Sequence, residues 1–119
     1  MTIKRKTKKV KPIHRVYVTY FPDGTYYIGY SSKMGAPYEK YFGSNKTILE
    51  MVKENPDNHG LTKETIFESS RKAEAKMQEF LLQWENRHDE RMLNDMINIR
   101  LRMSYLKDFT PLSWQPKPS

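Results

Sequence analysis

Apolar, β-branched and aromatic residues are concentrated in residues 14–21 and again in residues 25–31. Segments rich in such residues are typical of β-strands. Between the two segments, Pro22-Asp23-Gly24 has the composition of a three-residue hairpin loop, in which the glycine takes the left-handed position. The sequence therefore predicts an antiparallel hairpin.

A three-residue loop also sets the register, placing Tyr17 opposite Gly29 and making Tyr17 and Tyr27 diagonal neighbours, roughly 7 Å apart. The face expected to join the core carries Val16, Val18, Tyr20, Tyr26, Ile28 and Tyr30. The other face carries Tyr17, Thr19, Phe21, Thr25, Tyr27 and Gly29. We expect Gly29 to leave open space beside Tyr17. The second face then has two interpretations, a shallow polar site or ordinary cross-strand aromatic packing.

Further elements follow the hairpin. We expect a loop over residues 31–37, and then a helix over residues 45–54 with Ser44 as its N-cap. The cluster of Pro, Asp, Asn and Gly at residues 56–60 ends this helix. Residues 61–69 read as a third strand.

The strongest helical pattern begins after a cap at Ser69 or Ser70 and extends to about His88. Its predicted core stripe consists of Ala73, Met77, Phe80, Leu81 and Trp84. Glu79 lies beside this stripe, so its carboxylate should emerge at the margin between core and solvent. A further segment, residues 89–106, has methionines and isoleucine at near-helical spacing, and residues 111–119 are expected to be extended.

These elements predict an α+β fold, in which a small three-stranded antiparallel sheet, made of the hairpin and the third strand, is flanked by helices. At 119 residues the chain is expected to form one domain, over residues 13–107, with a C-terminal tail over residues 108–119. It has no cysteine and no long apolar run, which favours a soluble protein of the reducing cytoplasm.

The net charge of +7 comes mainly from the first twelve residues, which contain no acidic residue. The rest of the chain carries 15 basic and 14 acidic residues. We expect this basic arm, residues 1–12, to be disordered on its own and to bind nucleic-acid phosphates. A purely solubilising tail is the alternative. The basic residues of the arm are Lys4, Arg5, Lys6, Lys8, Lys9 and Lys11.

The order of elements, Tyr17, the tripeptide Tyr27-Ile28-Gly29 and a late helical glutamate together resemble the GIY-YIG nuclease module. In that family, a first strand ending in Gly-Ile-Tyr precedes a second strand that carries Tyr-Ile-Gly. Here the first tripeptide is Arg15-Val16-Tyr17, which keeps the tyrosine and loses the glycine. The resemblance covers residues 15–98. It is greatest to small free-standing phage endonucleases of the homing type, whose Tyr-x-Gly-Ser stretch is matched by Tyr41-Phe42-Gly43-Ser44.

The resemblance implies a hydrolase that cuts DNA phosphodiester bonds with one divalent ion, usually Mg²⁺. It assigns the metal to Glu79, with Glu74 as the nearest competitor, although a solvated helix-face carboxylate is the alternative for Glu79. It places Tyr17 and Tyr27 at the scissile phosphate, where one of them activates or orients the attacking water. A tyrosine whose pKa stays near 10 needs a nearby cation to act as a base at neutral pH.

One family feature is absent, since no arginine occurs on the helix after Tyr-Ile-Gly or anywhere in residues 30–59. A lysine lacks the two-pronged phosphate contact of an arginine, so the exchange puts catalysis in question. We expect Lys40 to be the substitute. The alternatives, which are also candidate nucleic-acid contacts, are Lys33, Lys46 and Arg71.

Two further residues are expected to be structural at the site. Gly29 belongs to the Tyr-Ile-Gly tripeptide. The late asparagine of the family is matched by Asn98, with Asn94 as the alternative. We expect this asparagine to tie the C-terminal segment to the core near the site.

Three functions remain open at this point. The first is a phage or mobile-element DNA endonuclease that nicks or cuts both strands. The second is a catalytically impaired nucleic-acid-binding module of the same fold, and the third is an interaction protein that uses its basic arm. We expect no separate DNA-recognition region, so specificity would come from the arm, the loop over residues 31–40, the tail, a homodimer or a partner protein.

Overall fold

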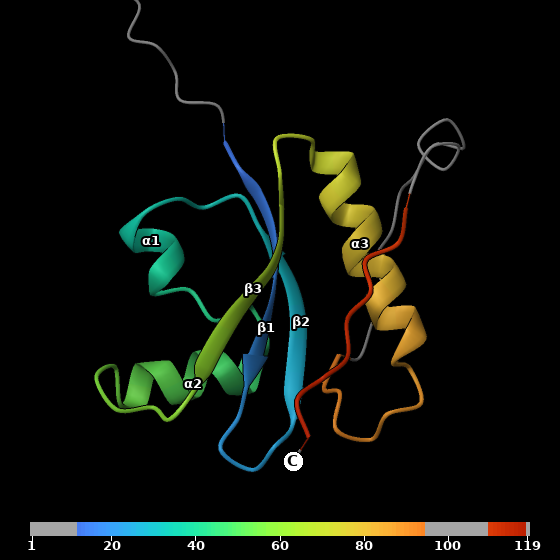
Figure 1. Ribbon diagram of the computed structural model, residues 1–119. Coiled ribbons are helices and arrows are strands. Elements are labelled where there is room, and N and C mark those ends of the chain that lie inside the picture. The colour runs from blue at the N-terminus through green and yellow to red at the C-terminus, as the bar shows by residue number, and fades with distance from the viewer. Residues whose placement is uncertain (1–11, 95–109, 119) are drawn as a thin grey trace, which may run out of the picture.

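The computed structural model describes residues 12–94 and 110–118, so residues 1–11 of the basic arm and Asn98 lie outside it. The fold is α+β, as expected, with a three-stranded antiparallel sheet of order β2-β1-β3 flanked by helices (Figure 1). Its elements are β1 (His14–Tyr20), β2 (Tyr26–Ser31), α1 (Ala36–Glu39), α2 (Lys46–Glu54), β3 (Thr62–Ser69) and α3 (Lys72–Glu85). Within the described chain, no helix combines the length and apolarity needed to span a bilayer.

The hairpin of β1 and β2 has the predicted register, with Thr19 opposite Tyr27. The N–H of Phe21 donates to the carbonyl of Thr25 at 2.9 Å and closes the three-residue loop. Gly24 has a φ of 90°, the left-handed conformation that the loop requires of its last residue. The prediction of loop type and pairing is therefore confirmed.

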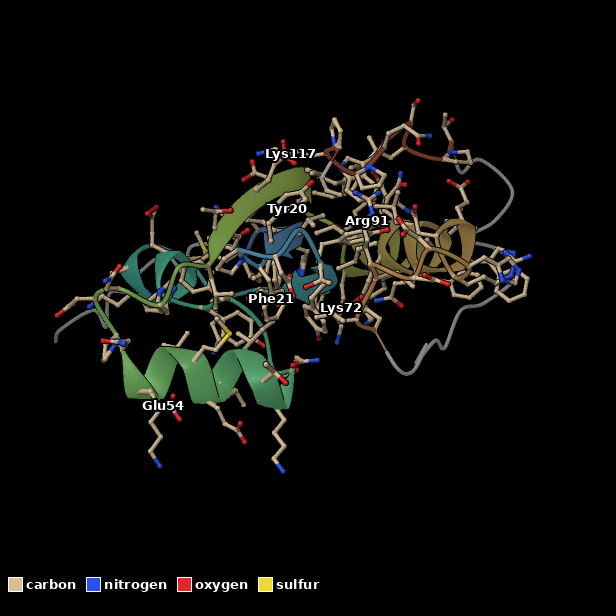
Figure 2. All side chains as sticks on the ribbon, turned by 90° about the horizontal axis from the view of Figure 1, so that it is seen from below. Tyr20, Phe21, Glu54, Lys72, Arg91 and Lys117 are labelled. Atoms are coloured by element: carbon tan, nitrogen blue, oxygen red, sulfur yellow. The ribbon has the colours of Figure 1, made fainter. Side chains whose placement is uncertain are left out.

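Both faces of the sheet are buried, each by a different helix (Figure 2). The first face packs on α3, and this core consists of Val16, Val18, Tyr26, Ile28, Ala75 and Leu82. The second face packs on α2 through a smaller cluster of Phe21, Ile48 and Leu61. The strand residues of the first core were predicted, whereas its helix residues Ala75 and Leu82 and the packing of the second face on α2 were not.

The third strand pairs with β1 and contains a bulge. Phe67 lies opposite Val16 and Thr65 lies opposite Tyr17, so Ile66 is the extra residue. Because of this extra residue, Ile66 and Phe67 both pack on the core beneath α3. The bulge thereby places Thr65 opposite Tyr17, so that the two side chains lie on the same face of the sheet.

Two predictions for the segment between β2 and α2 were wrong. The four-residue helix α1 begins at Ala36, inside the expected loop, and it is too short to have a periodic pattern. The N-cap of α2 is Asn45, whose side chain accepts from the N–H groups of Thr47 and Ile48, whereas Ser44 precedes the cap. Asparagine is as good an N-cap as serine, so composition alone did not distinguish the two.

The predicted core stripe of α3 was correct only for Met77, and the helix ends at Glu85 and not at His88. The buried residues of the helix are Ala75, Met77, Gln78, Leu82 and Gln83, and Trp84 is 48 % exposed. Two of these are glutamines, which a hydrophobic pattern assigns to the solvent side. They are buried because Gln78 bonds the backbone of Thr110 and Leu112, and Gln83 bonds the carbonyl of Ile28. The N-cap is Arg71, not Ser69 or Ser70.

The outer edge of β2 is covered by residues 91–94, which were expected to belong to a helix. Tyr26 donates its N–H to the carbonyl of Arg91 at 2.9 Å, and the N–H of Leu93 donates to Tyr26 at 2.8 Å. The rest of that expected helix lies outside the described residues. Residues 110–118 form no helix or strand, and Leu112 and Trp114 pack on the core.

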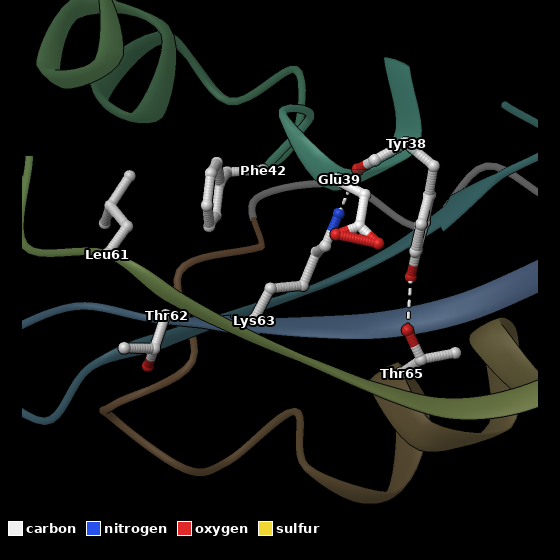
Figure 3. A pocket seen from close by; sticks show the side chains of 7 residues that line it. All are labelled: Tyr38, Glu39, Phe42, Leu61, Thr62, Lys63 and Thr65. Atoms are coloured by element: carbon white, nitrogen blue, oxygen red, sulfur yellow. Dashed lines mark hydrogen bonds between the residues drawn. The ribbon is translucent and has the colours of Figure 1, made fainter. Parts of the chain in front are cut away.

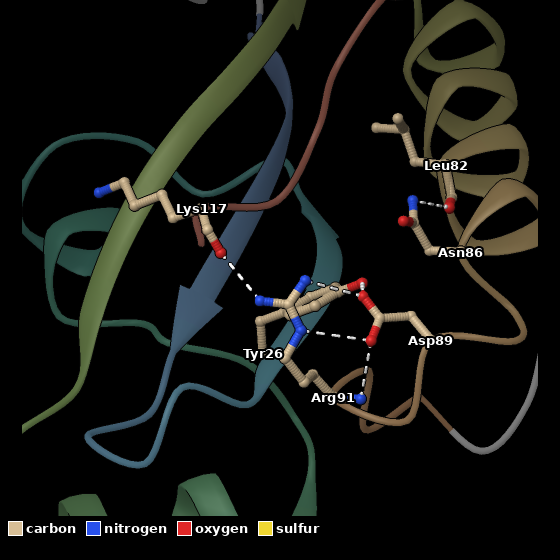
Figure 4. A network of polar contacts seen from close by, with 6 residues as sticks. All are labelled: Tyr26, Leu82, Asn86, Asp89, Arg91 and Lys117. Atoms are coloured by element: carbon tan, nitrogen blue, oxygen red, sulfur yellow. Dashed lines mark hydrogen bonds and ion pairs between the residues drawn. The ribbon is translucent and has the colours of Figure 1, made fainter. Parts of the chain in front are cut away.

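A polar network fastens this edge and the tail together (Figure 4). Asp89 accepts from the Tyr26 hydroxyl at 2.8 Å and from Arg91 Nη2 at 3.1 Å. Arg91 Nη1 also donates to the carbonyl of Lys117 at 2.9 Å. The hydrogen bonds from Arg91 lower the pKa of Asp89 to about 2.

We expect Asp89→Asn to destabilise the fold at neutral pH, because Arg91 and Tyr26 lose a charged acceptor. The ordinary pKa of 3.8 falls to about 2 on folding, so the carboxylate stabilises fully above about pH 4 and progressively less toward pH 2. Urea titrations of wild type and variant should therefore converge in this range. The exposed Asp57→Asn is the matched control. A difference that stays constant down to about pH 2 would contradict this role.

Candidate active site

Tyr17 crosses from β1 to β2 directly above Gly29. A Cβ atom added to Gly29 would lie 2.5 Å from Cζ of the Tyr17 ring, so only glycine fits here. The Tyr17 side chain is 1 % exposed. The expectation of open space beside Tyr17 was therefore wrong, because the phenol itself fills that space, and the tyrosine face is not a shallow polar site.

Further aromatic rings surround Tyr17. Tyr38 and Tyr41 approach it edge-on, with ring centroids 6.2 and 6.0 Å away. Tyr27 lies beneath Gly43, where an added Cβ would be 2.8 Å from Cε2 of the Tyr27 ring. The glycine of the Tyr-x-Gly-Ser stretch therefore makes room for Tyr27, as Gly29 makes room for Tyr17. Aromatic packing, the alternative weighed for this face, is present.

Glu79 on α3 faces the edge of β2, and its side chain is 15 % exposed. Its carboxylate accepts from Lys76 Nζ at 3.1 Å and from Gln83 Nε2 at 3.3 Å. Gln83 also donates to the carbonyl of Ile28 at 3.1 Å, which fixes this turn of the helix against the Tyr-Ile-Gly tripeptide. Glu79 is thus held at the core margin, as expected.

The negative charge of Glu79 reaches both motif tyrosines. Burial is the main cause that raises the pKa of Tyr17 well above 10, and neighbouring phenols and Glu79 add to it. Burial also raises the pKa of Tyr27, and Glu79 contributes there too. Burial also raises the pKa of Glu79, and Lys76 offsets part of this rise. At neutral pH the two phenols are therefore hydrogen-bond donors, not bases.

Asn94 ties the C-terminal segment to the site. Its Oδ1 accepts from the N–H of Ile28 at 2.9 Å, and its Nδ2 donates to the carbonyl of Ile28 at 2.8 Å. The side-chain amide thereby replaces a neighbouring strand at the edge of β2. This is the role expected of the late asparagine, and it is filled by the alternative to Asn98.

The basic residues named as substitutes for the arginine are scattered. Lys33 Nζ lies 5.0 Å from the ring centroid of Tyr41. Arg71 pairs with Glu74 at 4.0 Å, outside the cluster. In the described part of the chain, three of them are exposed and have no polar or cation–π contact with the motif tyrosines or Glu79: Lys40, Lys46 and Arg71.

Three cations that the sequence did not single out lie closer. Lys76 bonds Glu79, and it was missed because the buried face of α3 was misassigned. Arg15 lies 4.6 Å from the ring centroid of Tyr38, and strand alternation from Tyr17 would have placed it on this face. Lys63 Nζ lies 5.7 Å from the Tyr17 ring, a position that depends on the bulge in β3 and has no sequence signal.

The described side chains could bind a divalent ion through a single carboxylate. Among residues 12–94 and 110–118, no group of three or more His, Cys, Asp or Glu side chains is arranged to hold a metal. Mg²⁺ is commonly bound through one or two carboxylates, with waters and substrate phosphates completing its shell. Glu79 is the carboxylate that could serve in that mode, and Lys76 offsets part of the rise in its pKa that burial causes.

Comparison with known proteins returned no match to a family model, a curated protein or a solved structure. The resemblance to GIY-YIG nucleases therefore depends on the sequence motifs and their order. The contacts described above show what those motif residues do in this fold: Tyr17, Tyr27 and Glu79 surround the Tyr-Ile-Gly edge of β2, and Asn94 fastens it.

Gly29→Ala should destabilise the protein by about 1–3 kcal/mol, because the new methyl group overpacks the Tyr17 ring. Chemical denaturation of a double-mutant cycle with Tyr17→Ala gives the test. In the Tyr17→Ala background the ring is gone, so the cost of Gly29→Ala should largely disappear. An equal cost in both backgrounds would show that the glycine is required for another reason.

Proposed function

We propose that the protein is a small metal-dependent endonuclease that hydrolyses phosphodiester bonds in DNA. The observation that supports this most is the convergence of Tyr17, Tyr27 and Glu79 around the edge of β2. These residues come from three separate elements, and they are the ones that the GIY-YIG resemblance assigns to the phosphate and the metal.

The roles of the side chains follow from their protonation states. Tyr17 and Tyr27 have raised pKa values, so they act as donors that orient the phosphate or the attacking water, and they do not remove its proton. Glu79 would hold a Mg²⁺ ion. When bound, such an ion neutralises phosphate charge and makes its bound water more acidic. Lys76, 3.1 Å from Glu79, is the cation best placed to approach an anionic substrate there.

Binding to DNA would also need contacts outside this site. We propose that the basic arm, Lys33 and Lys46 supply sequence-independent phosphate contacts. Base-specific recognition would need a partner protein or a second copy of the chain. A phage-encoded enzyme of this kind would act in the cytoplasm of its host.

A second candidate function is a binding module of the same fold that has lost catalysis. The observation in its favour is that Tyr17 is 1 % exposed and therefore cannot touch a phosphate in this conformation. The absence of an arginine from residues 30–59 also favours a module without catalysis. The two candidates differ in whether the protein cuts DNA or only retains it.

The test is relaxation of supercoiled plasmid in Mg²⁺ or in EDTA. Wild type should nick or linearise the plasmid in Mg²⁺ only. Glu79→Gln keeps the shape of the side chain but removes the charge, and we expect its rate to fall about 100-fold or more. Tyr17→Phe removes only the hydroxyl group and should lower the rate about 100-fold.

Glu74→Gln is the matched control, because Glu74 lies in the first turn of the same helix and was the competing metal ligand. It should cut at the wild-type rate. If wild type and Glu79→Gln leave the plasmid equally intact, the nuclease proposal fails. Salt-sensitive retention of DNA by such an inactive protein, lost on removal of residues 1–12, would then identify the binding module.

A further inference from the structure

Residues 35–43, which we call the cover, lie over the Tyr17 face of the sheet and contain α1 (Figure 1). Gly35 and Gly43 bound it, with φ values of 63° and 134°, which side chains rarely adopt. A Cβ atom on Gly35 would have no neighbour within 4 Å, so that end is not packed. The cover therefore begins and ends at residues that tolerate a change of backbone direction.

Side chains of the sheet hold the cover by its carbonyl groups. Lys63 of β3 donates to the carbonyls of Tyr38 and Tyr41, the latter at 2.7 Å. Thr19 of β1 donates to the carbonyl of Phe42 at 2.5 Å. These polar contacts, which water can replace, act together with the edge-on packing of Tyr38 and Tyr41 on Tyr17 and the packing of Phe42 on the α2 cluster.

Next to these contacts lies an open pocket of about 420 Å³ between the cover and β3 (Figure 3). The Tyr38 hydroxyl and Thr65 Oγ1 form a hydrogen bond of 2.6 Å at one side of it. Phe42 and Leu61 line the other side, and Lys63 lies between them. The cover is thus fastened at a few points along a hollow, and not packed throughout.

The burial of Tyr17 conflicts with a role at a phosphate unless the cover moves. We propose that the cover is a closed gate over the active site, held shut by Lys63, and that it opens locally to admit the DNA phosphate. This proposal rests on the proposed function for its purpose. The local opening itself is a property of the fold and is testable without cleavage.

The charge of Lys63 gives the gate a pH dependence. Burial lowers the pKa of Lys63 to about 8 from an ordinary 10.5; Glu39 raises the value and Arg15 lowers it. The rings of Tyr17 and Tyr38 also face the ammonium group. Opening hydrates Lys63 and returns its pKa toward 10.5. Between about pH 8 and pH 10.5, the open state therefore binds more protons than the closed state. The open population should therefore fall as pH rises from about 8 to about 10.

Amide hydrogen exchange tests the gate on the full chain. The amides of Tyr38 to Tyr41 donate within the cover, and in wild type they should exchange at least about tenfold faster than those of β1. Lys63→Met removes the amino group that donates to both carbonyls, and we expect exchange in the cover to rise about tenfold more while β1 is unchanged. Lys53→Met, on the exposed side of α2, is the matched control.

A second, milder variant tests the gate in case Lys63→Met does not fold. Thr65→Val breaks only the hydrogen bond to Tyr38 and should speed exchange in the cover less than Lys63→Met; Thr62→Val, on the same strand, should not. With rates corrected for intrinsic exchange at each pH, the open population of wild type should fall from pH 8 to 10, and that of Lys63→Met should not.

Two results would overturn the proposal. One is equal protection of the cover and β1 in wild type, and the other is acceleration by Lys63→Met throughout the protein. The nuclease proposal fails separately: if wild type leaves the plasmid intact, the exchange results can still support local opening of the cover. If wild type does cut, Lys63→Met should cut faster at low DNA concentration. Faster exchange without faster cutting would mean that the cover does not limit access.

Discussion

The placement of the Tyr17 ring above Gly29 is the contact on which the rest of the site depends. Because glycine has no side chain, the phenol can cross from the central strand to the edge strand. Glu79 of α3 lies beside that edge. The same crossing buries the ring, and this requires a layer above it, which α1 and Tyr41 supply. A single small residue thus determines both the position of the hydroxyl group and its isolation from solvent.

The second constraint is the unpaired edge of β2, whose backbone groups must find partners. They find them in side-chain amides and in a short extended segment: Gln83 and Asn94 bond Ile28, and residues 91–93 bond Tyr26. Gln83 is one turn from Glu79 on α3. Satisfying the edge therefore also sets the rotation of the helix, and with it the position of the carboxylate beside the tyrosines.

The predictable parts of this protein were those encoded by local chemistry. Pro22-Asp23-Gly24 defined the loop, and the loop defined the register that puts Tyr17 and Tyr27 on one face. The buried side of α3 was not predictable, because it depends on Gln78 and Gln83 bonding to distant backbone groups. Nor was the position of Lys63, since the bulge at Ile66 changes which residues of β3 face Tyr17.

In the proposed endonuclease, Glu79 and the two motif tyrosines would already be in place when the substrate arrives. We propose that Glu79 holds a divalent ion there, beside the Tyr-Ile-Gly edge of β2. Paramagnetic Mn²⁺ at substoichiometric concentration tests it most directly, through line broadening in amide NMR spectra. We predict selective broadening at Ile28 and Gly29 in wild type, lost in Glu79→Gln and retained in Glu74→Gln. Identical broadening in wild type and Glu79→Gln, or broadening centred on Glu74, would contradict the claim.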